Sequence, residues 1–244
     1  SGDRNAMQVK VSLSVRQILV ALVASVVLLT IAGTAVQIGK YVFDYREGWT
    51  RFFNLDREYN LPSVFSSLLL LSCAILMRSR EERGRELGEQ GADSWRLLGN
   101  IFAFLAADEL LGLHEILIIP DLAKWLGLPG FLRPLWVIPG TMAVIWAAWK
   151  FTPFWRQLST QLRRRSLVSM VVYVGGALLM EMAGGAYSDL EGQQNLVYAL
   201  MTVVEEVLEM GGVILLLRAL LLELRPWSGV FSLEAVVSGR PRKL

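Results

Sequence analysis

A stretch of membrane length, residues 102–119, is almost continuously apolar and yet contains four ionisable side chains. Each ionisable side chain at the centre of a membrane helix costs at least about 2.5–3.5 kcal/mol, and such residues usually face a bundle interior and mark function. Two further apolar runs, residues 167–183 and 198–217, carry carboxylates as well. The ionisable residues of the three runs are Asp108, Glu109, His114, Glu115, Glu181, Glu205, Glu206 and Glu209.

The composition of the whole chain agrees with a membrane environment. Of the 244 residues, 54% are hydrophobic and 19% are charged, and the mean hydropathy is +0.45. This is too apolar for a typical soluble domain of this length and indicates a multi-pass membrane protein. The single cysteine, Cys73, excludes an intrachain disulfide and a cysteine-based metal site.

Six segments qualify as membrane spans, so we expect an all-α polytopic membrane helical bundle with about six transmembrane helices. The segment 134–149 contains Pro139 followed by Gly140, which predicts a kink. The other segments are free of proline except near their ends. The expected spans are residues 17–39, 59–77, 95–119, 134–149, 166–186 and 196–217.

The distribution of Lys and Arg predicts the orientation, because cytoplasmic loops of membrane proteins are enriched in these residues. Eighteen of them fall in the two termini and in the loops that follow the second and fourth spans, and six fall on the other side. Both termini are therefore expected in the cytoplasm of a bacterial cell, with the chain in the inner membrane. We expect a tag remnant and cytoplasmic lead in residues 1–16, a six-helix transmembrane domain in 17–224 and a cytoplasmic tail in 225–244.

This orientation places the acidic residues in the outer half of the bilayer, roughly 8–20 Å below the outer surface. On a straight helix, Asp108, Gly112 and Glu115 share one arc, and His114 points about 120° away from Asp108. Gly112 then leaves room for an ion or another helix. We expect the residues to meet in one outward-facing pocket, capped by the loop 44–60.

Positive charge is scarce around these carboxylates. No Lys or Arg occurs in residues 97–123 or 166–217, and the chain has one histidine. Several carboxylates that lie close together in a low dielectric cannot all stay ionised without compensation. Protons or a metal ion are the remaining sources of that compensation.

Two motifs are similar to an uncharacterised family of multi-pass bacterial membrane proteins. They are FNLDxExNLPxxFS, which covers residues 53–66, and DExxxxHE, which covers residues 108–115, and a late glutamate-rich helix follows them. The resemblance implies architecture and transfers no activity. It singles out Asp56, Glu58, Asn60, Pro62 and Ser66 as motif positions near the outer face.

The leading functional hypothesis is a divalent metal site. The expected ligands, which are rich in oxygen and contain one imidazole, favour Mn²⁺, Mg²⁺ or Ca²⁺ and disfavour iron without excluding it. A metal would make the protein a candidate enzyme on a lipid-linked or envelope substrate, with Glu206 as general base. The expected metal ligands are Asp108, Glu109, His114, Glu115, Glu181, Glu205 and Glu209.

Two alternatives stay open. A proton- or cation-handling transporter uses the same acids as a relay, and a non-catalytic membrane scaffold holds them protonated and hydrogen-bonded to one another. The expected partners are the lipid bilayer and, for the enzyme, a lipid-linked substrate. Nucleic acid is not expected as a partner, because the arginines of residues 78–85 alternate with glutamates as on a solvated helix.

Overall fold

A computed structural model describes residues 7–55, 57, 59–224 and 230–237, and most of these residues are helical. Motif positions Asp56 and Glu58 lie outside the described residues, as do residues 1–6 of the expected tag and residues 225–229 and 238–244 of the expected tail. The long helices are α1 (Val15–Val42), α2 (Leu61–Glu86), α3 (Ala92–Leu111), α5 (Val137–Gln157), α6 (Thr160–Val174), α7 (Glu181–Glu191) and α8 (Leu196–Glu223).

Short elements connect or extend these helices. A single π-helical turn, η4 (Gly175–Met180), joins α6 to α7. Strands β1 (Met7–Ser14) and β2 (Val230–Val237) pair antiparallel, with Met7 opposite Val237 and Ser14 opposite Val230. The remaining short helices are η1 (Gly48–Phe53), η2 (His114–Leu117), α4 (Pro120–Trp125) and η3 (Gly130–Leu132).

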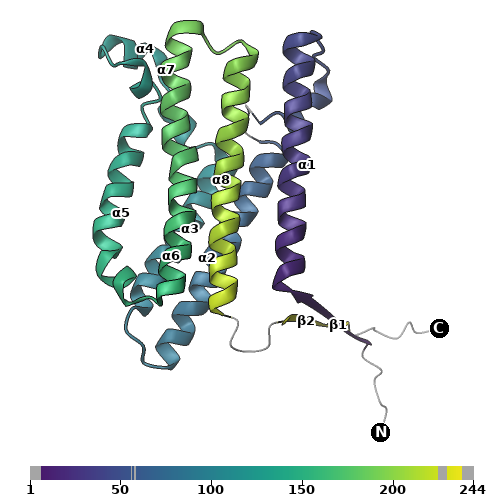
Figure 1. Ribbon diagram of the computed structural model, residues 1–244, viewed down its shortest axis with the longest axis vertical. Helices are drawn as coiled ribbons and strands as arrows, with labels where there is room; N and C mark the ends of the chain where they lie inside the picture. The colour runs from purple at the N-terminus through teal and green to yellow at the C-terminus, as the bar shows by residue number, and fades with distance from the viewer. Residues whose placement is uncertain (1–6, 56, 58, 225–229, 238–244) are drawn as a thin grey trace, which may run out of the picture.

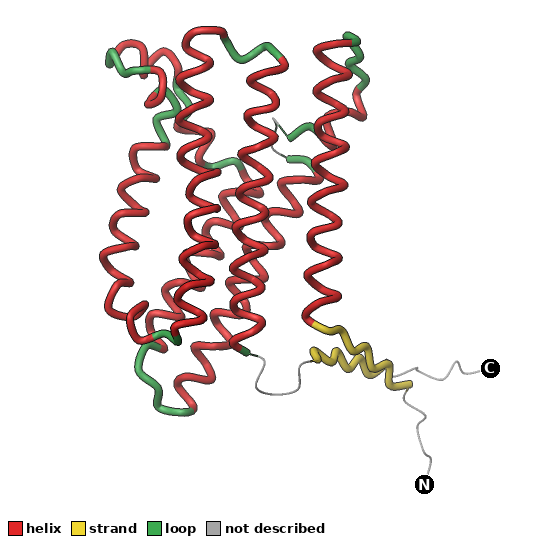
Figure 2. The backbone as a smooth tube through the Cα atoms, in the orientation of Figure 1, coloured by secondary structure: helices red, strands yellow, loops and turns green. Residues whose placement is uncertain are grey.

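The long helices run up and down along the longest axis of the molecule (Figure 1). The α2–α3 turn, the α5–α6 turn and the strand pair lie at one end, which we call the basic end because most Lys and Arg residues lie near it. Figure 2 shows the strands, in yellow, beside the first turn of α1. The α7–α8 connection lies at the opposite end.

Within the described residues, three helices are long and apolar enough to cross a membrane: α1, α2 and the continuous helix Thr160–Glu191. Helix α8 has a similar length but carries three glutamates in its first half. Large apolar side chains are exposed along these helices, for example Leu28, Ile75 and Val171. Exposed apolar surface of this extent is typical of a lipid-facing surface.

Helix α8 holds the bundle together, because it packs against α1, α2, α6, η4 and α7. Its half toward the basic end is apolar and buried, and this half includes Met210, Val213, Ile214, Leu217 and Leu220. The half of α8 toward the basic end thus packs in a hydrophobic core, whereas its glutamates lie in the other half.

Two glycines allow α8 to approach its neighbour closely. A Cβ at Gly176 would lie 2.9 Å from the Glu205 carbonyl oxygen, and one at Gly212 would lie 2.6 Å from the Tyr173 backbone nitrogen. In addition, the Ser169 hydroxyl donates to the Gly212 carbonyl at 2.7 Å. The small residues therefore bring the backbone of η4 and α6 against the glutamate-bearing part of α8.

Several expected helix boundaries differ from the structure. The expected span 95–119 ends at Leu111, because Gly112 adopts a left-handed conformation (φ 56°) and caps α3. The expected span 59–77 continues as α2 to Glu86, and the span 134–149 continues as α5 to Gln157. Neither the strand pair nor the π-helical turn was predicted.

Candidate acidic site

The end of α3 brings Asp108 and His114 together. After Gly112 the chain turns back into η2, so that Asp108 Oδ1 accepts the His114 backbone N–H at 2.9 Å and Oδ2 lies 3.1 Å from His114 Nδ1. The expectation that Asp108 and Glu115 share one helical arc is wrong, because Glu115 lies beyond the end of α3. Gly112 ends the helix and does not open a space between two acids on it.

Glu109, the neighbour of Asp108, is half-buried and faces α2. The Ser66 hydroxyl of α2 is buried and lies near the Glu109 carboxyl. The next residue, Ser67, donates to the Ala106 carbonyl at 2.7 Å and ties α2 to α3. Glu109 also lies within electrostatic reach of Asp108 and His114.

A second contact joins α7 to α8. The carboxyl groups of Glu181, at the start of α7, and Glu205, on α8, approach each other closely. Glu181 also lies within electrostatic reach of His114 and Glu115, and the indole of Trp136 faces it. The ring of Trp136 lies 5.3 Å from the ring of His114, which connects this contact to the end of α3.

Tyr173 on α6 lies between the two groups of acids. It is half-buried and within electrostatic reach of Asp108 and Glu109 on α3 and of Glu206 and Glu209 on α8. Its backbone is fixed against α8 by the close approach of Gly212. Tyr173 was not predicted as a site residue, because it lies in the apolar run 167–183 with no signal of this role in the sequence.

The π-helical turn η4 precedes Glu181 directly. A π-helical turn inserts an extra residue into a helix and occurs frequently at functional sites. Here it contains Gly175 and Gly176, and Gly176 packs on the backbone of Glu205 and Glu209. The turn therefore sets the position of Glu181 relative to the α8 glutamates.

We call the acids on these helices, with His114 and Tyr173, the acidic network. Among the residues that the structure describes, no three His, Cys, Asp or Glu side chains are close enough together to hold one metal ion. Glu115 is exposed on η2 and contributes at longer range. The acids of the network are Asp108, Glu109, Glu181, Glu205, Glu206 and Glu209.

The FNLDxExNLPxxFS motif supports this site from the side of α1. Asn60 caps α2 by accepting the Ser63 N–H at 2.9 Å, and its amide donates to the Asn54 carbonyl at 2.6 Å. The fully buried Gln37 of α1 donates to the Asn54 side chain. Tyr59 then donates to the Leu111 carbonyl at 2.7 Å, which joins the motif to the last residue of α3.

The fold and the site define a class of protein: a helical protein whose membrane-length apolar helices carry carboxylates that lie near one another inside the bundle. Residues 18–224 match the family described as Domain of unknown function (DUF8692), and the chain belongs to that family. Neither a curated protein nor a solved structure matches the chain.

Proposed function

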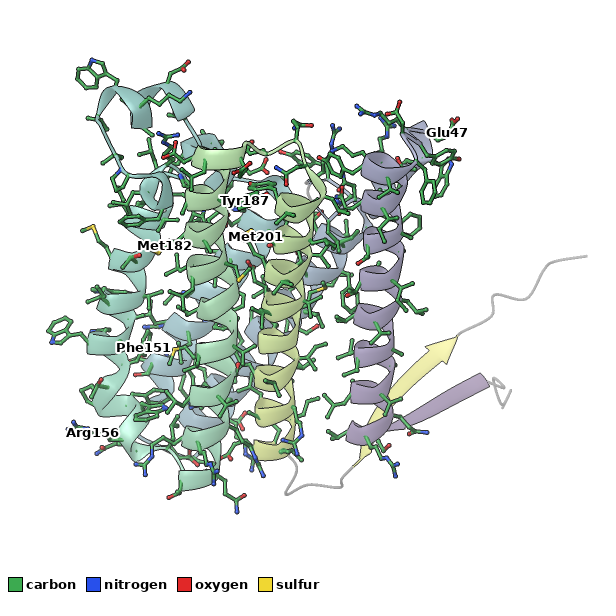
Figure 3. The ribbon with its side chains drawn as sticks, turned by 45° about the horizontal axis from the view of Figure 1, so that its top comes forward. Glu47, Phe151, Arg156, Met182, Tyr187 and Met201 are labelled. Carbon is green, nitrogen blue, oxygen red and sulfur yellow. The ribbon has the colours of Figure 1, made fainter. Side chains whose placement is uncertain are left out.

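We propose that this chain is a six-pass protein of the bacterial inner membrane, with its basic end in the cytoplasm. The α2–α3 and α5–α6 turns and the strand pair lie at the same end, and most of the Lys and Arg residues lie near it (Figure 1). Figure 3 shows Arg156 near this end and Glu47 at the opposite end. The acidic network then lies in the outer half of the bilayer.

We propose that the acidic network binds a cation, and that in the arrangement described here this cation is a proton. The observation that carries this proposal is the close approach of the Glu181 and Glu205 carboxyl groups. Two ionised carboxylates have acceptors and no donor and repel each other, so a proton on one of them would stabilise this approach. The absence of Lys and Arg from the sequences 97–123 and 166–217 supports the same conclusion.

The position of the network favours a one-sided site over a transmembrane route for ions. Toward the basic end, α8 continues with the buried apolar residues Val213, Ile214 and Leu217. These side chains offer no donor or acceptor for a proton or an ion. The network is therefore suited to binding, or to acid–base chemistry on a substrate that arrives from the outer side.

A metal-dependent enzyme is a second candidate, and the excess of carboxylates over nearby basic residues favours it. Asp108, Glu109, Glu205 and Glu209 supply oxygen ligands of the kind that Mn²⁺, Mg²⁺ and Ca²⁺ prefer. Side chains would have to reorient to bring three of them to one ion. Glu206 would then be available as general base for an envelope or lipid-linked substrate.

The test is the pH dependence of the melting temperature, measured with a chelator present. The folded protein holds a proton that the unfolded chain releases at neutral pH, so this stabilisation is present at low pH and lost as the pH rises. Glu205→Gln replaces the titrating proton by an amide N–H that donates to Glu181 permanently. We expect the melting temperature of wild type to fall as the pH rises, and that of this variant to fall about half as much or less.

Glu191→Gln is the matched control, because Glu191 is an exposed residue at the end of the same helix as Glu181. It should retain the wild-type pH dependence. An equal pH dependence in wild type and Glu205→Gln would contradict the proton proposal. A melting temperature that Mn²⁺, Mg²⁺ or Ca²⁺ raises in wild type but not in Glu205→Gln would favour the metal-dependent enzyme.

A further inference from the structure

A groove of about 390 Å³ lies between α3 and α5 near the basic end, remote from the acidic network. The same two helices are in contact through the rings of Trp95 and Phe154, which meet edge-on with centroids 5.2 Å apart. The lining residues are Asp93, Ser94, Arg96, Leu97, Asn100, Lys150 and Phe151. Helix α5 is on the side of the bundle away from α1, so the groove is not covered by α1 (Figure 1).

The two basic residues of the groove lie inside helices, not in the turn between them. Lys150 precedes the end of α5 at Gln157 by seven residues, which corresponds to roughly 10 Å along the helix. Its side chain is exposed, and within the described part of the chain it forms no ion pair. A cationic side chain at this depth on a lipid-facing surface requires an anion or must reach back to the headgroup region.

Asp93 also lines the groove, and its negative charge would oppose an anion. Its Oδ1 is engaged by two arginines, Arg85 Nη2 at 3.0 Å and Arg96 Nη2 at 3.1 Å. A guanidinium has five N–H donors, so Arg96 retains donors for another acceptor. Arg96 and Lys150 together outweigh Asp93, so the net charge of the groove is positive.

The apolar residues of the groove lie beside the basic ones. Leu97 and Phe151 are half-buried, and Phe151 lies on α5 farther from the basic end than Arg156 (Figure 3). A bound molecule would thus meet hydrogen-bond donors in Arg96, Ser94, Asn100 and Lys150 and apolar surface in Leu97 and Phe151. A phosphate with an attached acyl chain has this combination, whereas free phosphate does not use the apolar surface.

We infer that this groove binds an anionic phospholipid, with the headgroup phosphate between Arg96 and Lys150 and an acyl chain along Leu97 and Phe151. Basic pockets between transmembrane helices on the cytoplasmic side are suited to such headgroups. The inference uses the membrane orientation proposed above but is independent of the acidic network. The site would hold the ends of α3 and α5 together, where Gly91 already packs on the Phe154 ring.

The experiment compares the melting temperature of the full chain in neutral detergent with added phosphatidylglycerol, phosphatidylcholine or inorganic phosphate. Phosphatidylglycerol should raise the melting temperature by about 3 °C or more, because it binds the folded state. Phosphatidylcholine and inorganic phosphate should have little effect. Lys150→Gln and Arg96→Gln should each lose at least about half of the increase.

Arg164→Gln is the matched control, since Arg164 is exposed at the basic end but outside the groove. It should keep the full response to phosphatidylglycerol. Native mass spectrometry should also show fewer retained phosphatidylglycerol molecules on Lys150→Gln than on wild type. An equal response to phosphatidylcholine or to phosphate, or a full response in Lys150→Gln and Arg96→Gln, would overturn the inference.

Discussion

The two ends of the bundle compensate buried carboxylates in different ways. At the basic end, the side chain of Glu81 on α2 is 5% exposed and lies 2.8 Å from Arg78 Nη1 and 3.0 Å from Arg85 Nε. At the other end, the carboxyl of Glu181 lies close to a second carboxyl, Glu205. The first arrangement balances charge with fixed cations, and we propose that the second does so with a proton.

This difference matters because the two kinds of compensation respond differently to pH. A guanidinium stays protonated at every pH at which the protein is folded. A proton between two carboxyls is lost as the pH rises, and the repulsion that it prevents then appears. If the acidic network holds a proton as proposed, the basic end has a structural role and the acidic network responds to pH.

Breaking the contact that brings α8 against α6 should have the largest effect. A Cβ at Gly212 would meet the Tyr173 backbone nitrogen at 2.6 Å and Cα at 2.8 Å, and a backbone cannot move aside as a side chain can. We expect Gly212→Ala to lower the free energy of unfolding by about 1–3 kcal/mol. Denaturant unfolding followed by tryptophan fluorescence measures this change.

Gly211→Ala is the control for this prediction. A Cβ at Gly211 would meet nothing within 4 Å, so the substitution should be neutral or stabilise α8 by up to about 1 kcal/mol. Similar losses in the two variants would show that helix propensity or lipid contact, and not the approach of α8 to Tyr173, decides stability here.

Removing the charge of Glu81 should have an intermediate effect. Breaking a fully buried ion pair costs about 3–5 kcal/mol, but Arg78 and Arg85 are about half exposed and can regain water, so we expect Glu81→Gln to cost about 1–2 kcal/mol. The loss should be the same at pH 6 and pH 9. Glu82→Gln, one position away and exposed, should stay within about 0.5 kcal/mol of wild type in the same measurement.

The sequence predicted the helical architecture well, because apolar runs of membrane length have few alternative folds. It also identified Asn60, Pro62 and Ser66, and the structure gives their roles: Asn60 caps α2, Pro62 occupies its first turn and Ser66 faces Glu109. The distribution of Lys and Arg along the chain also predicted that most of these residues lie near one end of the bundle, where the α2–α3 and α5–α6 turns lie. Helix positions and the distribution of charge can be predicted directly from periodicity and composition.

The details of the acidic network were not predictable in the same way. Whether Gly112 continues a helix or ends it depends on one backbone conformation, and the left-handed choice places His114 beside Asp108. The π-helical turn before Glu181 has no sequence signature beyond two glycines. Tyr173 gains its role only because Gly212 lies opposite it on α8.

The smallest expected effect concerns Asp108, whose carboxylate contacts both the backbone N–H and the ring of His114. Asp108→Asn keeps an oxygen for the backbone N–H and removes a charge that repels Glu109, so we expect a change in the free energy of unfolding of less than about 1 kcal/mol. Asp108→Ala also loses the backbone hydrogen bond and should be less stable than Asp108→Asn by about 1 kcal/mol. Thermal and denaturant unfolding of the two variants beside wild type give these differences. If Asp108→Asn were as unstable as Asp108→Ala, the charge on Asp108 would be what holds His114 in place. Asp108 would then resemble Glu81, with His114 in the place of the two arginines, and the contrast between the two ends of the bundle would rest on Glu181 and Glu205 alone.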